Sequence, residues 1–94
     1  MKPRKTKELD KQLRKKGFVA NKRDHTYYYL CYKGKKTSIY TKLSHSISEY
    51  SDNLLGQVAR QLQLSNSELD GLFDCPFKYE DLIEKLKAKK ILIL

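Results

Sequence analysis

The residues best suited to chemistry gather in one aromatic stretch of the chain, between Asn21 and Tyr32. Threonine and tyrosine favour β-strands, and the side chains of a strand alternate between its two faces. One face is expected to carry the odd-numbered side chains, which are His25, Tyr27, Tyr29 and Cys31. The other face is expected to carry the even-numbered ones, which are Thr26, Tyr28, Leu30 and Tyr32. An imidazole and two phenols thus share a surface just after two cations.

The chemistry that this surface could perform is cleavage of RNA without a metal ion. RNA supplies its own nucleophile, the 2′-hydroxyl, so the protein must supply a base, an acid and cations that stabilise the charged transition state. Imidazole titrates near pH ~6.5, which makes His25 the candidate catalytic residue. The candidates for holding phosphate and stacking bases are Lys22, Arg23, Lys42, Tyr27 and Tyr29. On this pattern alone, a strand histidine is more often a bystander than a catalyst.

The residue clusters that metal chemistry requires are missing from the sequence. Nuclease chemistry with metal ions needs grouped carboxylates, and only Asp24 lies near the aromatic stretch. Cys31 and Cys75 stand in no CxxC pair, and only two histidines could join them, so no zinc site is expected. We expect two reduced thiols, with one disulfide as the alternative. No metal and no cofactor are therefore expected.

Charge is distributed unevenly along the chain. The net charge is +9, but residues 1–50 hold fourteen Lys and Arg against four Asp and Glu, whereas residues 51–94 hold six against seven. The aromatic stretch thus lies in a half of net charge +10, which favours a polyanionic partner such as nucleic acid. The alternative is that the charge serves only solubility. The longest aliphatic run, Ile91–Leu94, is far too short to cross a membrane, and we expect no signal peptide and a cytoplasmic location.

Periodicity and turn residues predict an α+β fold of the order α-β-β-β-α over residues 6–64. The expected elements are a disordered basic arm at 1–5, a helix capped by Thr6 and running to about Lys16, strands at 18–20, 25–32 and 37–41, a polar loop at 43–50 that contains His45, and a helix that starts at Ser51 or Asp52. Gly17 should end the first helix, and Gly34 should turn the hairpin between the second and third strands. The three strands are expected to pair as an antiparallel sheet, with both helices on one face.

The last thirty residues, 65–94, are predicted to form a helical extension packed on the basic unit of residues 1–64. Ser65 and Glu68 fit a capping box, which is typical of a helix start. The apolar stripe that should face the domain consists of Leu69, Leu72, Phe73, Leu82, Ile83 and Leu86. Ile91–Leu94 is expected either to extend this contact or to form part of a homodimer interface.

Residues 6–64 resemble the HicA family of mRNA interferase toxins. The resemblance rests on Leu9, Leu13, Gly17 and Phe18, followed by a strand that opens with His25, a glycine turn, a third strand and an amphipathic helix. It implies a fold like that of double-stranded-RNA-binding domains and metal-free RNA cleavage by one histidine on the second strand. It also implies inhibition by a HicB-type antitoxin. Arg23-Asp24 stands here where the family usually has Gly-Ser directly before the histidine.

Two functions of different classes follow from these observations. The first is a toxin-like endoribonuclease that acts on mRNA with His25 as its catalyst. The second is a non-catalytic nucleic-acid-binding module that uses the same basic, tyrosine-rich sheet. A third, a protein-interaction adaptor, treats the basic surface as a means of solubility alone.

Overall fold

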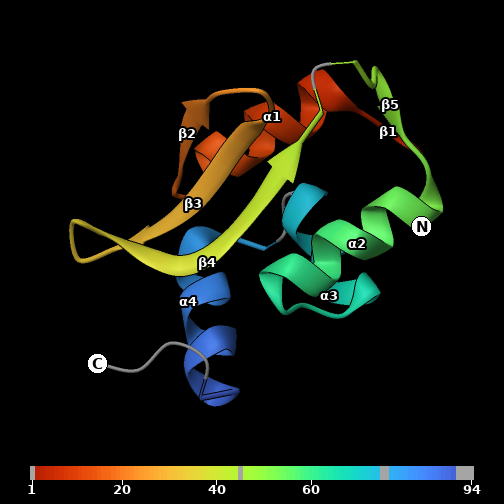
Figure 1. The fold of residues 1–94 in the computed structure, drawn as a ribbon. Helices are drawn as coiled ribbons and strands as arrows, with labels where there is room; N and C mark the ends of the chain where they lie inside the picture. Colours follow the sequence, from red (N-terminus) through yellow and green to blue (C-terminus); the bar gives the residue numbers. More distant parts are fainter. Residues whose placement is uncertain (1, 45, 75–76, 91–94) are drawn as a thin grey trace.

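The computed structural model describes residues 2–44, 46–74 and 77–90. The elements in chain order are β1 (Arg4–Lys5), α1 (Thr6–Lys15), β2 (Phe18–Lys22), β3 (Thr26–Tyr32), β4 (Lys35–Leu43), β5 (Glu49–Tyr50), α2 (Asp52–Leu62), α3 (Asn66–Phe73) and α4 (Tyr79–Ala88) (Figure 1). The predicted α+β class and the antiparallel sheet of three strands are confirmed. His45 and Ile91–Leu94 lie outside the described residues, and so does Cys75.

The sheet has the order β2-β3-β4, and both pairings are antiparallel. Lys33 and Gly34 alone form the turn between β3 and β4, with φ angles of 52° and 76°. Positive φ at both central residues is typical of a two-residue hairpin turn, whose twist matches that of the strands. The tight turn leaves more residues for pairing, so β4 covers Lys35–Leu43 instead of the predicted 37–41.

One face of this sheet forms the wall of the hydrophobic core. Tyr28, Leu30, Ile39 and Leu43 are at most 2% exposed, and they occupy alternate positions of β3 and β4. Helices α1 and α2 cover this face with side chains that are equally buried, namely Leu9, Leu13, Leu55 and Val58. Burial of each such side chain stabilises the fold by roughly 1.5–3 kcal/mol. Because side chains alternate along β3, one face of the strand is committed to the core and the other face is left outside it.

The N-terminal segment is ordered, whereas residues 1–5 were predicted to form a disordered arm. Arg4 and Lys5 form β1, which pairs with β5 inside the predicted loop at 43–50. The Arg4 guanidinium lies 3.0 Å from carboxylates of both Asp70 and Asp74. Two charge-assisted hydrogen bonds hold this buried cation to α3 and its C-terminus, which explains why a basic segment is not free in solvent.

Helix α1 starts without a side-chain cap and is followed by a glycine. Thr6 does not cap it as predicted, because the Thr6 hydroxyl donates to the Ile47 carbonyl at 2.5 Å. Gly17 follows the helix with φ at 92°, a conformation that glycine adopts without strain. A Cβ at Gly17 would lie 2.4 Å from a ring carbon of Tyr79, so this glycine also allows α4 to approach α1 closely.

Helices α3 and α4 share the core of the basic unit. Leu69, Leu72, Leu82 and Leu86 are at most 1% exposed, and they belong to the same buried cluster as the sheet residues. The predicted capping box is present, since Ser65 accepts from the Glu68 amide and Glu68 accepts from the Ser65 amide.

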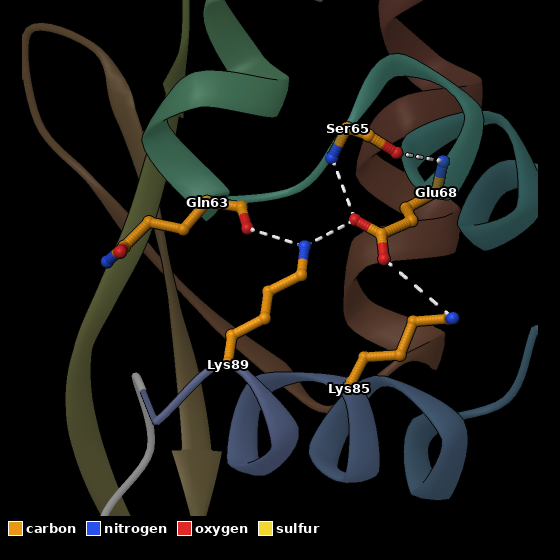
Figure 2. A network of polar contacts seen from close by, with 5 residues as sticks. All are labelled: Gln63, Ser65, Glu68, Lys85 and Lys89. Carbon is orange, nitrogen blue, oxygen red and sulfur yellow. Dashed lines mark hydrogen bonds and ion pairs between the residues drawn. The ribbon is translucent and has the colours of Figure 1, made fainter.

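A polar network fastens α4 to the start of α3 (Figure 2). Glu68 Oε1 accepts from Lys89 Nζ at 2.5 Å, and Glu68 Oε2 lies 3.7 Å from Lys85 Nζ. Lys89 also donates to the Gln63 carbonyl at 3.2 Å. The side-chain hydrogen bond from Lys89 holds the pKa of Glu68 below its usual value, so this carboxylate stays charged near neutral pH.

Candidate nucleic-acid interface

Three tyrosine rings gather on the face of the sheet that the helices leave uncovered. The Tyr29 and Tyr40 centroids are 5.5 Å apart, and Tyr27 lies 6.4 Å from Tyr29 and 6.3 Å from Tyr40. We call Tyr27, Tyr29 and Tyr40 the tyrosine face. The side chain of Tyr40 is 43% exposed, so part of this aromatic surface is open to solvent.

Strand alternation and register explain why these rings meet. Tyr27 and Tyr29 point away from the core because Tyr28, between them, points into it. Tyr28 is held there by a hydrogen bond from its hydroxyl to Asp10 Oδ1 on α1. Tyr40 faces Tyr29 directly across the β3–β4 ladder, and cross-strand neighbours of this kind lie close enough for their rings to touch.

Cations border the tyrosine face. The Arg23 guanidinium lies 5.6 Å from the Tyr27 centroid, and Lys36 Nζ lies 5.0 Å from the Tyr29 centroid. Lys42 is exposed and pairs with Tyr27 across the ladder. An aromatic platform edged with cations suits both the faces of bases and the phosphates between them.

His25 lies in the turn between β2 and β3, one residue before the strand in which it was predicted. The Arg23 amide donates to the His25 carbonyl at 2.8 Å and closes this turn. The His25 amide donates to Asp24 Oδ1 at 2.9 Å, and this hydrogen bond is the largest cause of a lowered pKa for the Asp24 carboxyl. The turn therefore places a charged carboxylate beside the histidine.

The imidazole of His25 is oriented toward that carboxylate. Nδ1 is buried and has no hydrogen-bond partner, and Asp24 Oδ2 lies 3.7 Å from it. A side chain exposure of 38% leaves the rest of the ring accessible. The 3.7 Å separation is an ion-pair distance and not a hydrogen bond, so Asp24 acts on the ring as a neighbouring negative charge.

A small pocket adjoins His25 at this end of the sheet. Its volume is about 150 Å³, and its polar lining includes Lys42 of β4 and Gln57 and Gln61 of α2. Gln61 also accepts a hydrogen bond from the buried Thr41 hydroxyl at 2.5 Å. His25 thus adjoins the helix-covered side at the sheet end, whereas strand alternation predicted that it would share the face of Tyr27 and Tyr29.

Most of the predicted site residues meet in space. Arg23, Tyr27 and Tyr29 meet directly on the tyrosine face, and Lys42 joins that face to the histidine pocket. Lys22 is exposed at the end of β2, opposite Thr26, and contacts none of the three rings in the described residues. It stays a predicted phosphate ligand at the border of the site.

Two residues of the interface were missed by the sequence interpretation, namely Tyr40 and Lys36. Both lie on β4, in the alternating run of exposed side chains Lys36, Ser38, Tyr40 and Lys42, which flanks the buried Ile39. The alternation of residues along β4 was the sequence feature that could have identified both. Which tyrosine of β3 faces Tyr40 depends on a shift of the pairing register between Tyr29 and Cys31, because the register set by the turn alone would place Tyr40 opposite Tyr27.

Comparisons with protein-family models, with curated proteins and with solved structures gave no match. In residues 2–44, 46–74 and 77–90, no three His, Cys, Asp or Glu side chains are grouped in a way that could hold a metal ion. Among the same residues, no helix combines the length and the hydropathy of a membrane span.

Proposed function

We propose that this protein binds single-stranded RNA on the tyrosine face. The observation that carries the proposal is the cluster of three rings on an uncovered sheet face, with Arg23 and Lys36 each over a ring. Bases stack on such rings at roughly 1–3 kcal/mol each, whatever their sequence. The cations at the border attract the phosphates.

Tyrosines on neighbouring strands also stabilise a sheet without any ligand, by roughly 0.2–1 kcal/mol for each cross-strand pair. Two features favour a binding role for this cluster. The exposed fraction of Tyr40 leaves ring area that no part of the described structure covers. The surrounding cations give the face a charge that sheet stability does not require.

The test of binding is the affinity of tyrosine variants for a labelled single-stranded RNA, measured by fluorescence anisotropy. Tyr40→Ala and Tyr29→Ala should each weaken binding by roughly 5- to 150-fold, the equivalent of one lost stack. Tyr32→Ala is the matched control, because Tyr32 lies on the same strand and contacts Lys33 and Lys87 instead of the cluster. Binding by Tyr40→Ala as tight as by the wild type would refute the proposal.

A second candidate function, metal-independent cleavage of the bound RNA, is favoured by the environment of His25. The imidazole has Asp24 beside Nδ1 and lies at the end of the tyrosine face, where Lys42 borders both. In this function His25 takes the proton of the 2′-hydroxyl, whose oxygen attacks the neighbouring phosphorus. The 5′ oxygen leaves with a proton from water, and Lys42 or Arg23 balances the charge on the phosphate.

This second candidate function is the activity that the resemblance to the HicA toxins implies. The protein would then be an mRNA interferase, and a HicB-type antitoxin would be its protein partner. Arg23-Asp24 gives the histidine a neighbouring carboxylate that a Gly-Ser sequence would not supply. The proposed enzyme thus has a negative charge beside its base.

Cleavage is tested by incubating the wild type with mixed single-stranded RNA in excess chelator. Cleavage should persist in the chelator, because the proposed base is a side chain and not a metal-bound hydroxide. His25→Ala should abolish cleavage and leave RNA affinity within about twofold, since an accessible imidazole contributes little to binding. A wild type that binds RNA but never cuts it in chelator excludes this candidate and leaves the binding function standing.

A further inference from the structure

The rings of Tyr27 and Tyr29 are nearly parallel and follow one another along β3. Their centroids are 6.4 Å apart, and their planes differ by 18°. This separation is shorter than the van der Waals width of an aromatic ring, so the two rings do not lie side by side in one plane. It also matches the distance of about 6.4–6.8 Å between alternate residues of a strand. The rings therefore stand on the sheet with one face of each directed at the other.

The outer faces of these two rings are covered by cations. Arg23 precedes β3, and its guanidinium lies over the Tyr27 ring at 5.6 Å from the centroid. Lys36 pairs with Cys31, two residues beyond Tyr29, and its Nζ lies over the Tyr29 ring at 5.0 Å. The two cations thus approach from opposite ends of β3. The ring faces that remain open are the inner ones.

The gap between the inner faces has the width of one flat ring. Stacked bases in a nucleic-acid strand are spaced by about 3.4 Å, so a base between two rings needs about 6.8 Å from ring to ring. The observed centroid distance is only slightly shorter. A small rotation of either side chain supplies the difference, because Tyr27 and Tyr29 are both only partly buried.

Apolar side chains border this gap on both neighbouring strands. Val19 of β2 and Tyr40 of β4 are the partners of Tyr29 in the two ladders. Within the described part of the chain, they are also the large apolar side chains that stay exposed, at 47% and 43%. Tyr40 lies 5.5 Å from Tyr29 and 6.3 Å from Tyr27, so it stands beside the gap and does not fill it. Exposed apolar area is therefore centred on a gap that a flat ligand fits.

We propose that Tyr27 and Tyr29 form a slot that takes one nucleobase of the bound RNA and stacks on both of its faces, an inference that rests on the proposed binding function. The slot accepts any base, because every base has two aromatic faces. The phosphates on either side of the inserted nucleotide lie toward Arg23 at one end and Lys36 at the other. A base can enter only after it leaves its own stack, so the slot selects unpaired RNA over a duplex.

The charge around the slot argues against a cationic occupant. Clustered aromatic rings can also enclose a quaternary ammonium ion. Here Arg23 and Lys36 already lie over the two rings and would repel a further cation. A nucleotide brings a flat neutral base and a negative phosphate, and it matches both the rings and the cations.

The first experiment is a titration with adenosine monophosphate, followed by NMR at the tyrosine ring protons. The Tyr27 and Tyr29 signals should shift together with one midpoint, on the order of a millimolar for a base stacked on two rings. Base protons should show nuclear Overhauser contacts to both rings and none to Tyr32, which contacts Lys33 and Lys87 instead. Contacts to one ring only, or no shift at about ten times that concentration, would overturn the slot. So would choline if it bound more tightly than the nucleotide.

Variants separate one shared base from two independent stacks. In Tyr27→Leu, the midpoint observed at the Tyr29 signals should rise by about fivefold or more, because the base loses one of its two stacked faces. Tyr27→Phe keeps the ring, so its midpoint should stay within about twofold of the wild type. An unchanged Tyr29 midpoint in Tyr27→Leu would show that each ring binds a base of its own, and the slot would be wrong.

The slot and the binding function can fail separately. If the nucleotide contacts only one ring but Tyr40→Ala weakens RNA binding, the slot is wrong and the tyrosine face stands as the binding surface. If the nucleotide contacts both rings but Tyr40→Ala leaves RNA binding unchanged, the slot stands as a nucleotide site and the RNA lies elsewhere. At equal salt, single-stranded RNA should bind at least about tenfold more tightly than a duplex of the same length, because the duplex must first unpair and unstack a base. Equal affinities would contradict base insertion.

Discussion

At the scale of single residues, Tyr28 shows how one side chain keeps the two faces of β3 apart. Its ring lies in the core, and its hydroxyl donates to Asp10 Oδ1 on α1 at 2.5 Å. Burial, and next the hydrogen bond to Asp10, raise the pKa of Tyr28 above the ordinary value of 10. The tyrosine neighbours on either side therefore remain available for ligands.

Tyr28→Phe should lower the free energy of unfolding by about 1.5–3 kcal/mol, because a carboxylate loses its hydrogen-bond donor. Urea denaturation at pH 7 measures this loss, with Tyr29→Phe on the outer face as the control that should change little. A raised folded pKa means that the contribution is complete below pH 10 and disappears as pH rises through the higher folded value. Tyr28→Phe should accordingly lack that part of the alkaline loss of stability.

At the scale of elements, the network around Glu68 joins two helices that are close in sequence. Glu68 completes the capping box of α3 and also binds Lys85 of α4 and Lys89, the residue just after α4 (Figure 2). Glu68→Gln keeps the cap, since glutamine also serves in capping boxes, but it removes the charge. The variant therefore isolates the helix-to-helix attraction.

Glu68→Gln should cost roughly 0.2–1 kcal/mol at pH 7, and Glu68→Ala should cost about 0.5–1.5 kcal/mol more, because the hydrogen bond from the Ser65 amide is then lost. The pKa of Glu68 is lowered in the fold, so its contribution is present above the ordinary value of 4.5 and is lost as pH falls through the folded pKa. Thermal unfolding at pH 7 and pH 3 checks both statements. Glu80→Gln, in the first turn of α4, is the control, and equal losses for Glu80→Gln and Glu68→Gln would contradict the assignment.

Sequence reasoning predicted the elements that local signals define. Gly17, Gly34 and the capping box at Ser65 each act through backbone geometry, which a few neighbouring residues determine. Strand β1 was not predicted, because two residues are too few to show the alternating pattern of a strand. Distant partners order Arg4, namely Tyr50 across the β1–β5 pairing and the carboxylates of Asp70 and Asp74.

The candidate site was predictable to the extent that it follows one strand. Alternation alone places Tyr27 and Tyr29 together. The contribution of Tyr40 depends on the register of β4, and the pocket of His25 depends on where α2 packs. Those two features arise from tertiary contacts, which spacing along the chain does not encode.

At the scale of the whole molecule, the basic charge divides between two sides of the sheet. Arg23, Lys36 and Lys42 border the tyrosine face, whereas Lys11 and Lys15 are exposed on α1, which covers the opposite face. The net charge attracts nucleic acid from any direction, but only contacts with phosphates release counterions on binding. The position of each cation should therefore affect the affinity for nucleic acid more than the net charge of the protein does.

Binding should weaken with salt along a straight line of log affinity against log salt, with a slope near −2 for three phosphate contacts at about −0.7 each. Arg23→Glu with Lys42→Glu should reduce affinity strongly and flatten the slope. Lys11→Glu with Lys15→Glu changes the net charge equally and should leave the slope unchanged. Identical salt plots for the two double variants would place the phosphates elsewhere.

The contacts of Arg4 have a consequence for the order of events during synthesis. Arg4 binds partners that follow it by 66 and 70 residues, so the ribosome must add most of the chain before this cation is neutralised. β1 can pair with β5 once residue 50 has emerged, but α3 follows only later, after on the order of a few seconds at typical elongation rates. During that interval the nascent chain leaves Arg4 unpaired and exposes the part of the core that α3 and α4 later cover, which is a surface that a ribosome-associated chaperone would bind.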